Sequence, residues 1–440
     1  MPIRDKFKKI VHLMIMYVKY KLDNWPPPLE MLVFGLQWLA VIIPTILIIG
    51  AVVGSIHGES YIPYLQKLMI LMGIMLLVQT LWGHKLPLVI GPATVLLIGV
   101  LATLDQGAGA INTSIIIGGG ILALLAGGGL FKYVEKLFTP KVIIVILMLI
   151  AFTLTPTILN LITAGGIVAP VNNFIFALFL LLIAFIAHGF LKGLWKSTLP
   201  LWIMLLGSFG YYGIFKVMSP VQDLSVVALP GNFMVLAVPD VGVVIAFLIC
   251  FLALAINDLG SIQAIGSLLK ADKMKDRVRR GITTTGLGNV LAGFLGVIGP
   301  VNYSMSPGII FSTKCASRFT LIPVGIILLI LSFSPMAIGI MSNIPSPVIG
   351  AVLIYIMTAQ IGAALLVSVE NNVFTSLDDG IIIGMPILLG TVLAFLPPTL
   401  SAQLPTIIRP IIANGFVMGI LAVLLLEHII YRDKSEENQE

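Results

Sequence analysis

The stretch FLGVIGPVNYSMSPGIIFST, residues 294–313, is strongly apolar but contains two prolines and three glycines. Proline removes a backbone donor and disfavours a helical conformation in the residue before it. Lipid offers no partner to a broken backbone, which survives in a bilayer only where it is buried in protein or lines a polar cavity. The interruption therefore predicts a functional site inside a membrane protein, with a plain proline kink as the alternative.

The composition of the whole chain agrees with a membrane protein. Of 440 residues, 58% are hydrophobic and 10% are charged, and the mean hydropathy is +1.10. A soluble domain carries about a quarter charged residues, and a bilayer-spanning helix needs roughly 20 apolar residues. We predict an all-α polytopic membrane protein with 14 transmembrane segments, centred near residues 43, 74, 95, 121, 152, 181, 206, 252, 290, 309, 330, 356, 388 and 419.

The positions of the basic residues indicate how the chain is oriented in the membrane. With the N-terminus in the cytoplasm, all 25 lysines and arginines except Lys67, Lys216 and Arg409 fall in cytoplasmic segments. Such an excess is the positive-inside pattern. It assigns KADKMKDRVRR, residues 270–280, to a cytoplasmic loop rather than to a nucleic-acid-binding patch. The basic stretch around Ile10–Val18 is either a helix on the membrane surface or a frayed tail.

The interruption occurs twice, at equivalent places. Seven segments precede a long linker and seven follow it, so the second half is inverted relative to the first. The third segment of each half, LPLVIGPATVLLIGV (86–100) and GPVNYSMSPGIIFST (299–313), reads as a short extended stretch and then a half-helix. Helices starting near Pro92 and Ser304 would present unpaired N–H groups and positive dipole ends. Paired breaks in inverted repeats predict a substrate site at the membrane midplane.

Few polar residues lie deep inside the predicted segments. In AINDLGSIQAIG, residues 255–266, Asp258 is the one carboxylate we assign to the interior of a segment, with Asn257, Ser261 and Gln263 nearby. An ionisable residue in that setting marks an ion or proton pathway; a salt bridge near the interface or a helix cap is the alternative. The glycine run GGGILALLAGGG, residues 118–129, predicts close helix packing.

The chain shows no motif for catalysis or for cofactor binding. It has no serine elbow, no metal-ligand spacing and no phosphate-binding loop, and its two cysteines, Cys250 and Cys315, lie in or beside predicted segments without histidine neighbours. We therefore expect neither an enzyme nor a metal site, and no cofactor apart from a coupling ion.

These motifs together resemble the nucleobase–cation symporter family, which includes uracil and xanthine permeases and nucleobase–ascorbate transporters. The resemblance runs from about Pro27 to Glu427. It rests on PPLEMLVFGLQWL, LPLVIGPAT, NDLGS, the stretch from GLGNVLAGFLG to NYSMSPG, and IPSPVIGAVLIY, in that order.

The resemblance implies a core domain that moves against a gate domain. Short strands and half-helices are expected in segments three and ten. The implied ranges are a cytoplasmic basic segment at 1–28, core at 29–138 and 219–342, gate at 139–218 and 343–430, and a cytoplasmic tail at 431–440.

The resemblance also implies the positions that contact the substrate. They are Thr45, Thr94, Asn257, Ser261, Tyr303, Ser304 and Met305, with Asp258 as the candidate residue for coupling to a proton or sodium ion. Family members characteristically have an acidic residue where Asn257 stands, and many have a glutamate where Met305 stands. This chain has neither.

We accordingly expect a secondary transporter of a nucleobase or similar small polar heterocycle in the plasma (inner) membrane, with both termini cytoplasmic. It would work by an elevator-type movement, contact lipid but no nucleic acid, and function as a monomer or a homodimer. The alternatives are an anion carrier or channel of the sulfate-transporter type, which shares the implied fold, and a membrane enzyme or scaffold.

Overall fold

The computed structural model describes residues 18–57, 61–217, 224–231, 236–303 and 306–431. The predicted surface helix at Ile10–Val18 lies almost entirely outside these residues. The first half contains α2 (Pro28–His57), α3 (Tyr61–Leu81), β1 (Ile90–Pro92), α4 (Thr94–Ala102), a 3₁₀ turn η1 (Leu104–Gln106), α5 (Gly107–Gly127), α6 (Phe131–Glu135), α7 (Pro140–Thr153), α8 (Thr155–Ile162), α9 (Pro170–Phe190), α10 (Leu194–Ser197) and α11 (Leu199–Phe215).

The second half begins with a long helix and again contains one short strand. Its elements are α12 (Val241–Leu268), α13 (Met274–Leu295), β2 (Pro300–Asn302), α14 (Ser306–Thr313), η2 (Arg318–Thr320), α15 (Leu321–Ser332), α16 (Pro335–Ser342), α17 (Ser346–Glu370), α18 (Leu377–Ala394), α19 (Pro398–Ser401), α20 (Arg409–Ile412), α21 (Gly415–Leu425) and a π-helical turn η3 (Leu426–Ile430).

The helices are long and apolar enough for a polytopic membrane protein. Within the described residues, eight helices have the length and composition to cross a membrane, or nine if the bent pair α15 and α16 is one span. All 14 predicted segment centres fall inside helices, but several of those helices are short or interrupted. The interruptions matter because they create the non-helical backbone at the centre of the molecule.

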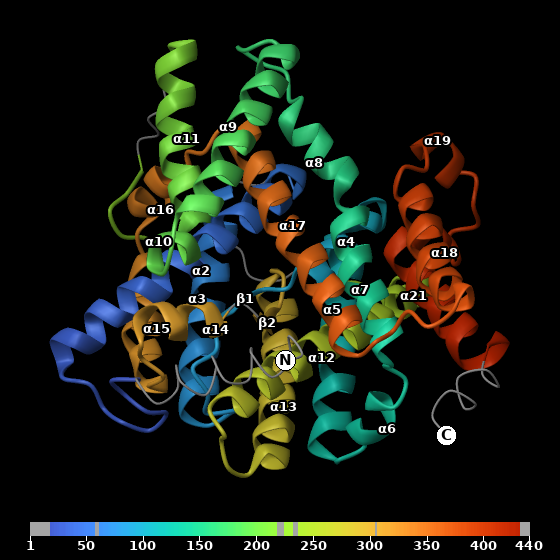
Figure 1. Ribbon diagram of the computed structural model, residues 1–440. Coiled ribbons are helices and arrows are strands. Elements are labelled where there is room, and N and C mark those ends of the chain that lie inside the picture. Colours follow the sequence, from blue (N-terminus) through green and yellow to red (C-terminus); the bar gives the residue numbers. More distant parts are fainter. Residues whose placement is uncertain (1–17, 58–60, 218–223, 232–235, 304–305, 432–440) are drawn as a thin grey trace.

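The two strands confirm that segments three and ten are broken. β1 and β2 pair antiparallel, with Ile90 opposite Asn302, Gly91 opposite Val301 and Pro92 opposite Pro300. They meet near the middle of the molecule (Figure 1), and all six strand residues are buried. Each strand leads into a short helix, α4 or α14. Two half-helices therefore extend from the strand pair β1–β2, which is called the seam below.

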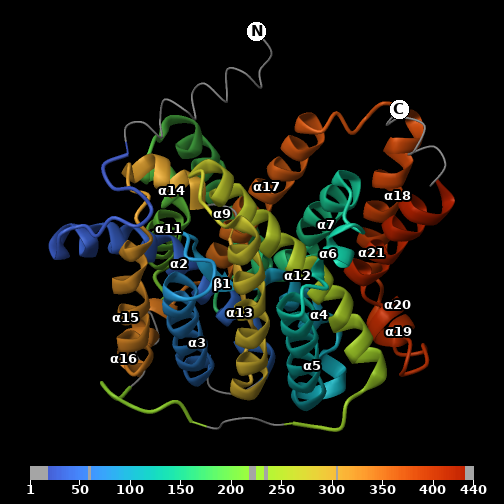
Figure 2. The ribbon, with the colours of Figure 1, turned by 90° about the horizontal axis from the view of Figure 1, so that it is seen from below.

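Glycines allow the helices around this seam to pack closely. A Cβ on Gly286 of α13 would lie 2.6 Å from the backbone nitrogen of Ala123 in α5, and one on Gly73 of α3 would lie 2.9 Å from the carbonyl oxygen of Gly325 in α15. Within the glycine run at 118–129, a Cβ on Gly119 would lie 2.8 Å from the carbonyl oxygen of Gly286, which confirms that this run serves helix packing. In Figure 2 the helices α15, α3, α13 and α5 stand in a row, joined through these contacts.

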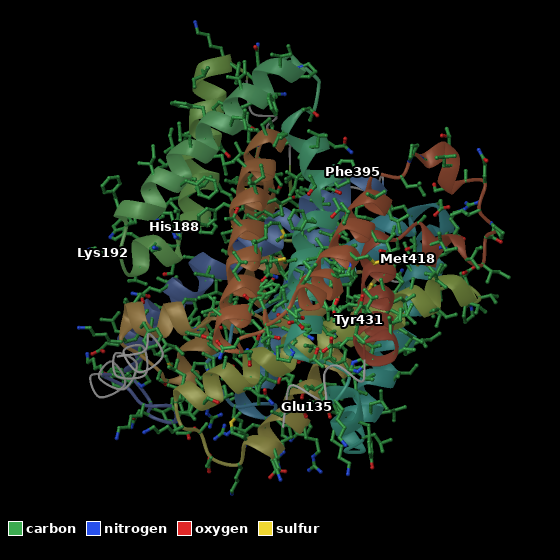
Figure 3. The ribbon with its side chains drawn as sticks, turned by 45° about the vertical axis from the view of Figure 1, so that its right-hand side comes forward. Glu135, His188, Lys192, Phe395, Met418 and Tyr431 are labelled. Atoms are coloured by element: carbon green, nitrogen blue, oxygen red, sulfur yellow. The ribbon has the colours of Figure 1, made fainter. Side chains whose placement is uncertain are left out.

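A second group of helices lies beside this row. α17, α18 and α21 pack on α7, and α9 packs on α17. α18 and α21 lie at the opposite edge of the molecule from α15 (Figures 1 and 2). Figure 3 shows His188 and Lys192 together at one end of α9, and the His188 ring nitrogen Nδ1 lies 2.8 Å from the Tyr355 hydroxyl of α17.

One predicted loop is largely helical. The charged stretch 270–280 was expected to be a loop, but α13 begins at Met274, so only Leu269–Lys273 connects it to α12. Arg277 explains this helical start, since its guanidinium donates to the carbonyl oxygens of His84 and Lys85 and so anchors the first turn of α13 to the loop after α3.

Candidate functional site

The backbone of the paired strands is satisfied by protein groups from both halves. Outside the ladder, Ala93 N donates to Gly299 O at 2.9 Å and Tyr303 N donates to Val89 O at 2.8 Å. Val89 N donates to the Ser306 hydroxyl at 2.9 Å. This extended backbone can therefore exist at membrane depth without lipid having to supply a hydrogen bond.

The carbonyl oxygen of Asn302, the last residue of β2, joins the strand to α12. It accepts from Asn257 Nδ2 at 3.3 Å and from the Ser261 hydroxyl at 3.0 Å. Asn257 and Ser261 are one helical turn apart, which puts both on the side of α12 that faces the strand. Ser261 is buried, whereas Asn257 is partly exposed.

The Asp258 carboxylate binds the backbone and side-chain nitrogens of Asn302. Its Oδ1 accepts from Asn302 N at 2.8 Å and from Asn302 Nδ2 at 2.7 Å, and its Oδ2 accepts from the Thr285 hydroxyl of α13 at 2.7 Å. Asp258 is 0% exposed. It forms neither a helix cap nor an ion pair with any described residue, so both sequence-based alternatives for this carboxylate are wrong.

Asp258 belongs to a closed ring of hydrogen bonds, called the buried ring below. The Asn302 side-chain oxygen pairs with His84 Nε2 at 3.1 Å, and His84 N donates to Gln79 Oε1 at 3.2 Å. Gln79 Nε2 in turn donates to the Thr285 hydroxyl at 3.0 Å, which closes the ring. All five members are buried: Gln79, His84, Asp258, Thr285 and Asn302.

The loop that carries His84 is held in place by its neighbours. Leu86 N donates to His84 Nδ1 at 3.0 Å, so the proton of a neutral imidazole must reside on Nε2, facing Asn302. The Arg277 guanidinium donates to the Lys85 carbonyl oxygen in the same loop and also pairs with the Asp272 carboxylate at 2.8 Å. The hydrogen bond from Arg277, with its positive charge, lowers the pKa of the exposed Asp272 carboxyl.

Tyr303 closes the other end of the seam. Its hydroxyl donates to Pro92 O at 2.8 Å, and its ring lies against Gly91, where a Cβ would come within 2.6 Å of the ring atoms. The Thr45 side chain of α2 interacts with the Tyr303 hydroxyl and donates to Ile42 O at 2.7 Å. Thr45 and Tyr303 are thus adjacent, as their assignment to one pocket requires.

The N-terminus of α4 has no side-chain cap. Its N-cap residue, Ala93, carries no hydrogen-bonding group, and the backbone N–H groups of Thr94, Val95 and Leu96 have no partner among the described residues. The first N–H groups of a helix need a partner, particularly when the helix end is buried. Together with the positive end of the helix dipole, these three donors suit an electronegative group of a ligand.

Open space lies beside Asn257 on α12. Gly260, three residues further along, is exposed, and a Cβ there would meet nothing within 4 Å. A different face of α12 lines an apolar cavity of about 260 Å³, which is bounded by hydrophobic residues and glycine from α5, α6 and α12. That cavity offers no polar group to a ligand and is separate from the candidate site.

The structure brings most of the predicted positions together. Thr45, Asn257, Ser261 and Tyr303 are linked through the seam, and Thr94 follows it directly, whereas Ser304 and Met305 lie outside the described residues. Gln263 points elsewhere, since its amide contacts Glu135 of α6 at 3.4 Å. Glu135 lies at one end of the molecule, away from Phe395 at the far end of α18 (Figure 3).

Four residues of the buried ring were not among the predicted site residues: Gln79, His84, Thr285 and Asn302. Asn302 lies in an interrupted segment and the other three are polar groups that flank or oppose such a segment, which is the signal that points to them. Within the described residues, no group of three or more His, Cys, Asp or Glu side chains is placed to hold a metal ion.

Comparisons with known proteins give consistent matches. The model of the Permease family matches residues 29–399. A putative purine permease of Clostridium perfringens is 30% identical over 335 residues, covering 73% of each chain. The uric acid permease PucK of Bacillus subtilis is 26% identical over 428 residues, covering 92% of this chain and 96% of its own.

Solved structures with similar folds are transporters. The transmembrane domain of the cyanobacterial bicarbonate transporter BicA superposes with a TM-score of 0.59 at 16% identity, covering 90% of this chain and 96% of that chain. The murine anion transporter Slc26a9 in its inward-facing state gives a TM-score of 0.61 at 12% identity, covering 96% of this chain and 71% of that chain. Identities this low show a shared fold and nothing about the solute.

Proposed function

The chain belongs to the Permease family, and on this premise we propose that it is a secondary active transporter of a nucleobase or a similar small polar heterocycle. Family membership makes it a multi-pass membrane permease rather than an enzyme, and it confirms the resemblance recognised in the sequence. The solute, the coupling ion and the movement are the proposed parts.

The observation that carries the proposal is the buried seam of β1 and β2 beside an uncapped helix end. Three N–H groups at the start of α4, which have no partner in the part of the chain that the structure describes, lie around the same strands as the partly exposed amide of Asn257. A flat heterocycle with ring N–H groups and oxygen or nitrogen acceptors can satisfy both kinds of partner.

The proposed substrate-contacting residues are the seven positions expected from the sequence. Asn257 and the α4 backbone would bind polar edges of the solute, Thr94 would contribute its hydroxyl, and Tyr303 would pack beside the ring with Thr45 behind it. Ser261 would act by holding the strand, since its hydroxyl is engaged with Asn302 O. Ser304 and Met305, which lie outside the described residues, complete the set of proposed substrate-contacting positions.

Asp258 would be the residue that couples solute transport to the ion. An ionised carboxylate accepts all three hydrogen bonds that this residue receives, whereas a protonated one must itself donate one. Proton uptake would therefore change the hydrogen bonds that hold Asn302. Because Asn257 donates to the Asn302 carbonyl oxygen, its position would change as well. A sodium ion is the other candidate for the coupling ion.

The proposed architecture is two inverted repeats of seven segments, giving 14 in total. Residues 29–138 and 219–342 would form the core, and residues 139–218 and 343–430 the gate, with an elevator-type shift of the core carrying the site across the membrane. We further propose a plasma (inner) membrane location with both termini in the cytoplasm, and assembly as a homodimer.

The test is a binding and transport assay on the purified full chain. Thermal-shift binding of uracil, xanthine, urate, guanine and adenine, followed by uptake of the radiolabelled binders into proteoliposomes, is expected to identify at least one accumulated base. Applied proton and sodium gradients would identify the coupling ion. Failure of every base to bind or accumulate would overturn the proposal.

The second candidate, an anion carrier, is favoured by the uncapped, positive end of α4, which suits a negatively charged solute. The purine and uric acid permeases among the sequence relatives weigh against it. Sulfate or bicarbonate flux in the same proteoliposomes, without any base uptake, would support it instead.

A further inference from the structure

The two helices that precede the interruptions lie beside each other's loops. α3 leads into β1, α13 leads into β2, and the two helices pack together (Figure 2). A Cβ on Gly281, near the start of α13, would lie 3.1 Å from the Cβ of His84, which follows the end of α3. The helices therefore run antiparallel, and the start of each lies beside the loop that follows the other.

Arg277, the fourth residue of α13, binds the loop between α3 and β1. Its Nη1 donates to His84 O at 3.1 Å and to Lys85 O at 2.8 Å, and its side chain is 12% exposed. Lys85 has a φ of 49–55° character typical of the left-handed region, at 55°, which is unfavourable for a residue with a Cβ. The hydrogen bonds from Arg277 therefore hold this loop in a conformation that it would not favour by itself.

Tyr64, the fourth residue of α3, binds the loop between α13 and β2. Its hydroxyl accepts from Ile298 N at 3.1 Å, shortly before the strand begins. The Lys67 ammonium lies at the same place, since a Cβ on Gly296, the C-cap of α13, would be 3.8 Å from Lys67 Nζ. A cation is favoured there by the negative end of the helix dipole. Because Tyr64 and Ile298 are both buried, loss of their hydrogen bond would leave an unsatisfied N–H.

The two anchors have matching places in the two halves of the chain. Each is the fourth residue of the helix before an interruption, and each holds the loop that leads into the interruption of the other half. Both loops run into the paired strands, and β1 is followed by the start of α4, whose first N–H groups have no hydrogen-bond partner within the described ranges. Donors that are fixed before a solute arrives do not have to be ordered on binding, which preserves affinity.

We propose that Arg277 and Tyr64 are positioning residues for solute binding, each acting through the loop that it holds. Without either anchor the chain would still fold, but the seam and the start of α4 would have to be ordered when the solute binds. This inference rests on the proposed function, since it takes the seam as the site of the transported base.

The test at Arg277 measures affinity and binding stoichiometry separately. Uracil, xanthine and urate are titrated into the purified full chain by isothermal titration calorimetry, and the tightest binder serves as the probe. Arg277→Met is expected to weaken its binding about tenfold, the effect of ordering about one residue of backbone on binding, with the number of sites per chain unchanged. Arg277→Lys, which retains a donor for one carbonyl oxygen, should bind within about threefold of the wild type.

Two variants control for charge at this end of α13. Arg279→Met removes a cation two residues further along the helix, where the side chain is 53% exposed beside Asp276. Asp272→Ala removes the carboxylate that pairs with Arg277 but leaves both loop carbonyl groups bound. Both variants should bind the probe with wild-type affinity.

Tyr64→Phe tests the other anchor by removing one oxygen atom. It is expected to weaken binding of the probe about fivefold, again at unchanged stoichiometry, because Ile298 N loses its acceptor. Tyr61→Phe is the matched control on the same helix, since the Tyr61 hydroxyl donates to Leu47 O in α2 and not to a loop of the seam. It should change affinity by less than about twofold.

The outcomes separate a positioning role from a structural one and from the proposed function. Fewer binding sites at wild-type affinity in Arg277→Met and Tyr64→Phe would show that the anchors serve folding alone, which overturns the inference and leaves the transport proposal standing. Equal losses of affinity in the anchor variants and their controls would overturn it as well. If Arg277→Met does not fold, the comparison of Tyr64→Phe with Tyr61→Phe decides. If no base binds the wild-type chain, the proposed function and this inference fall together.

Discussion

At the scale of single residues, the buried Asp258 carboxylate is held by hydrogen bonds. Asp258 lies on the interior of α12, where a carboxylate is costly unless its lone pairs are satisfied. Three donors from Asn302 and Thr285 satisfy it. Its neighbour Asn257 also contacts Asn302 but is partly exposed, since adjacent residues are about 100° apart around an α-helix.

Asp258→Asn separates the two roles of this carboxylate. The amide oxygen retains an acceptor for Asn302 while the titratable group is lost, so gradient-driven accumulation of substrate should disappear while substrate exchange stays within about twofold of the wild type. Proteoliposome uptake and counterflow measure the two processes. Asp240→Asn, at the N-cap of the same helix, is the control, since asparagine caps as well as aspartate. Normal accumulation by Asp258→Asn would reassign the residue to a structural role.

Gly91→Ala tests the contact between β1 and Tyr303. The new methyl group would lie 2.6 Å from the tyrosine ring and hydroxyl, so Tyr303 must move away from Pro92 O. We expect about a tenfold loss of substrate affinity in isothermal titration, equivalent to one hydrogen bond. Gly120→Ala in α5, whose new Cβ would meet only Val290 at 4.0 Å, should bind normally. Unchanged affinity in Gly91→Ala would show that Tyr303 is not part of the pocket.

At the scale of elements, buried polar groups tie together the ends of neighbouring helices. Lys141 at the start of α7 contacts Asp379 of α18 at 2.9 Å and Glu427 of the η3 turn at 3.4 Å. The side chains of Asp379 and Glu427 are 7% and 6% exposed. Asp379 also completes the capping box of α18 with Ser376, so a single cluster joins three helices of the proposed gate.

Lys141→Met should therefore destabilise the protein markedly. It leaves two buried carboxylates close together without a cation, and breaking a buried pair in this way costs about 3 kcal/mol or more of unfolding free energy. Thermal unfolding in detergent would measure the loss. Lys19→Met, which removes the exposed ion pair with Glu30, is the control and should change the unfolding free energy by less than about 1 kcal/mol. Equal melting temperatures for both variants would refute the role of the cluster.

At the scale of the whole molecule, the proposed core and gate touch at one end of α12. A Cβ on Gly242 would lie 2.1 Å from Ile407 O, so the start of α12 lies directly against the segment before α20. Close by in the sequence, Arg409 pairs with Asp105 of η1 at 2.8 Å. Further along α12 the helix is open beside Gly260, and the proposed core and gate also touch elsewhere, where α11 packs on α2 and α10 on α14.

A crosslink across this contact should stop transport if the core moves past the gate. With Cys250 and Cys315 replaced by alanine, Asp105→Cys combined with Arg409→Cys and treated with a cleavable bis-thiosulfonate should lose at least nine-tenths of its uptake and recover it on reduction. The matched control pair, Asp23→Cys with Arg318→Cys, replaces an ion pair within the proposed core and its N-terminal segment, and should remain active. Full uptake by the first crosslinked pair would exclude relative movement at this contact.

Features of the fold that depend on local sequence could be predicted, and features that depend on distant partners could not. The broken segments three and ten were predicted because proline and glycine act locally, through the backbone conformations they permit. The helical start of α13 was not, because its charged first turns are stabilised by Arg277 reaching carbonyls almost 200 residues earlier in the chain. The residues of the first turns of α13 do not by themselves indicate such a distant partner.

The sequence alone determined the membrane class, the helical segments and the two interruptions, since hydrophobic length and proline content act through local transfer energies and backbone sterics. Only the tertiary structure decided that the two interruptions pair as antiparallel strands. It also decided that Asp258 faces Asn302 and Thr285, and that Asn257 and Ser261 both donate to the carbonyl oxygen of Asn302. A buried polar group must find its partner wherever the fold brings one, and these partners come from distant parts of the chain.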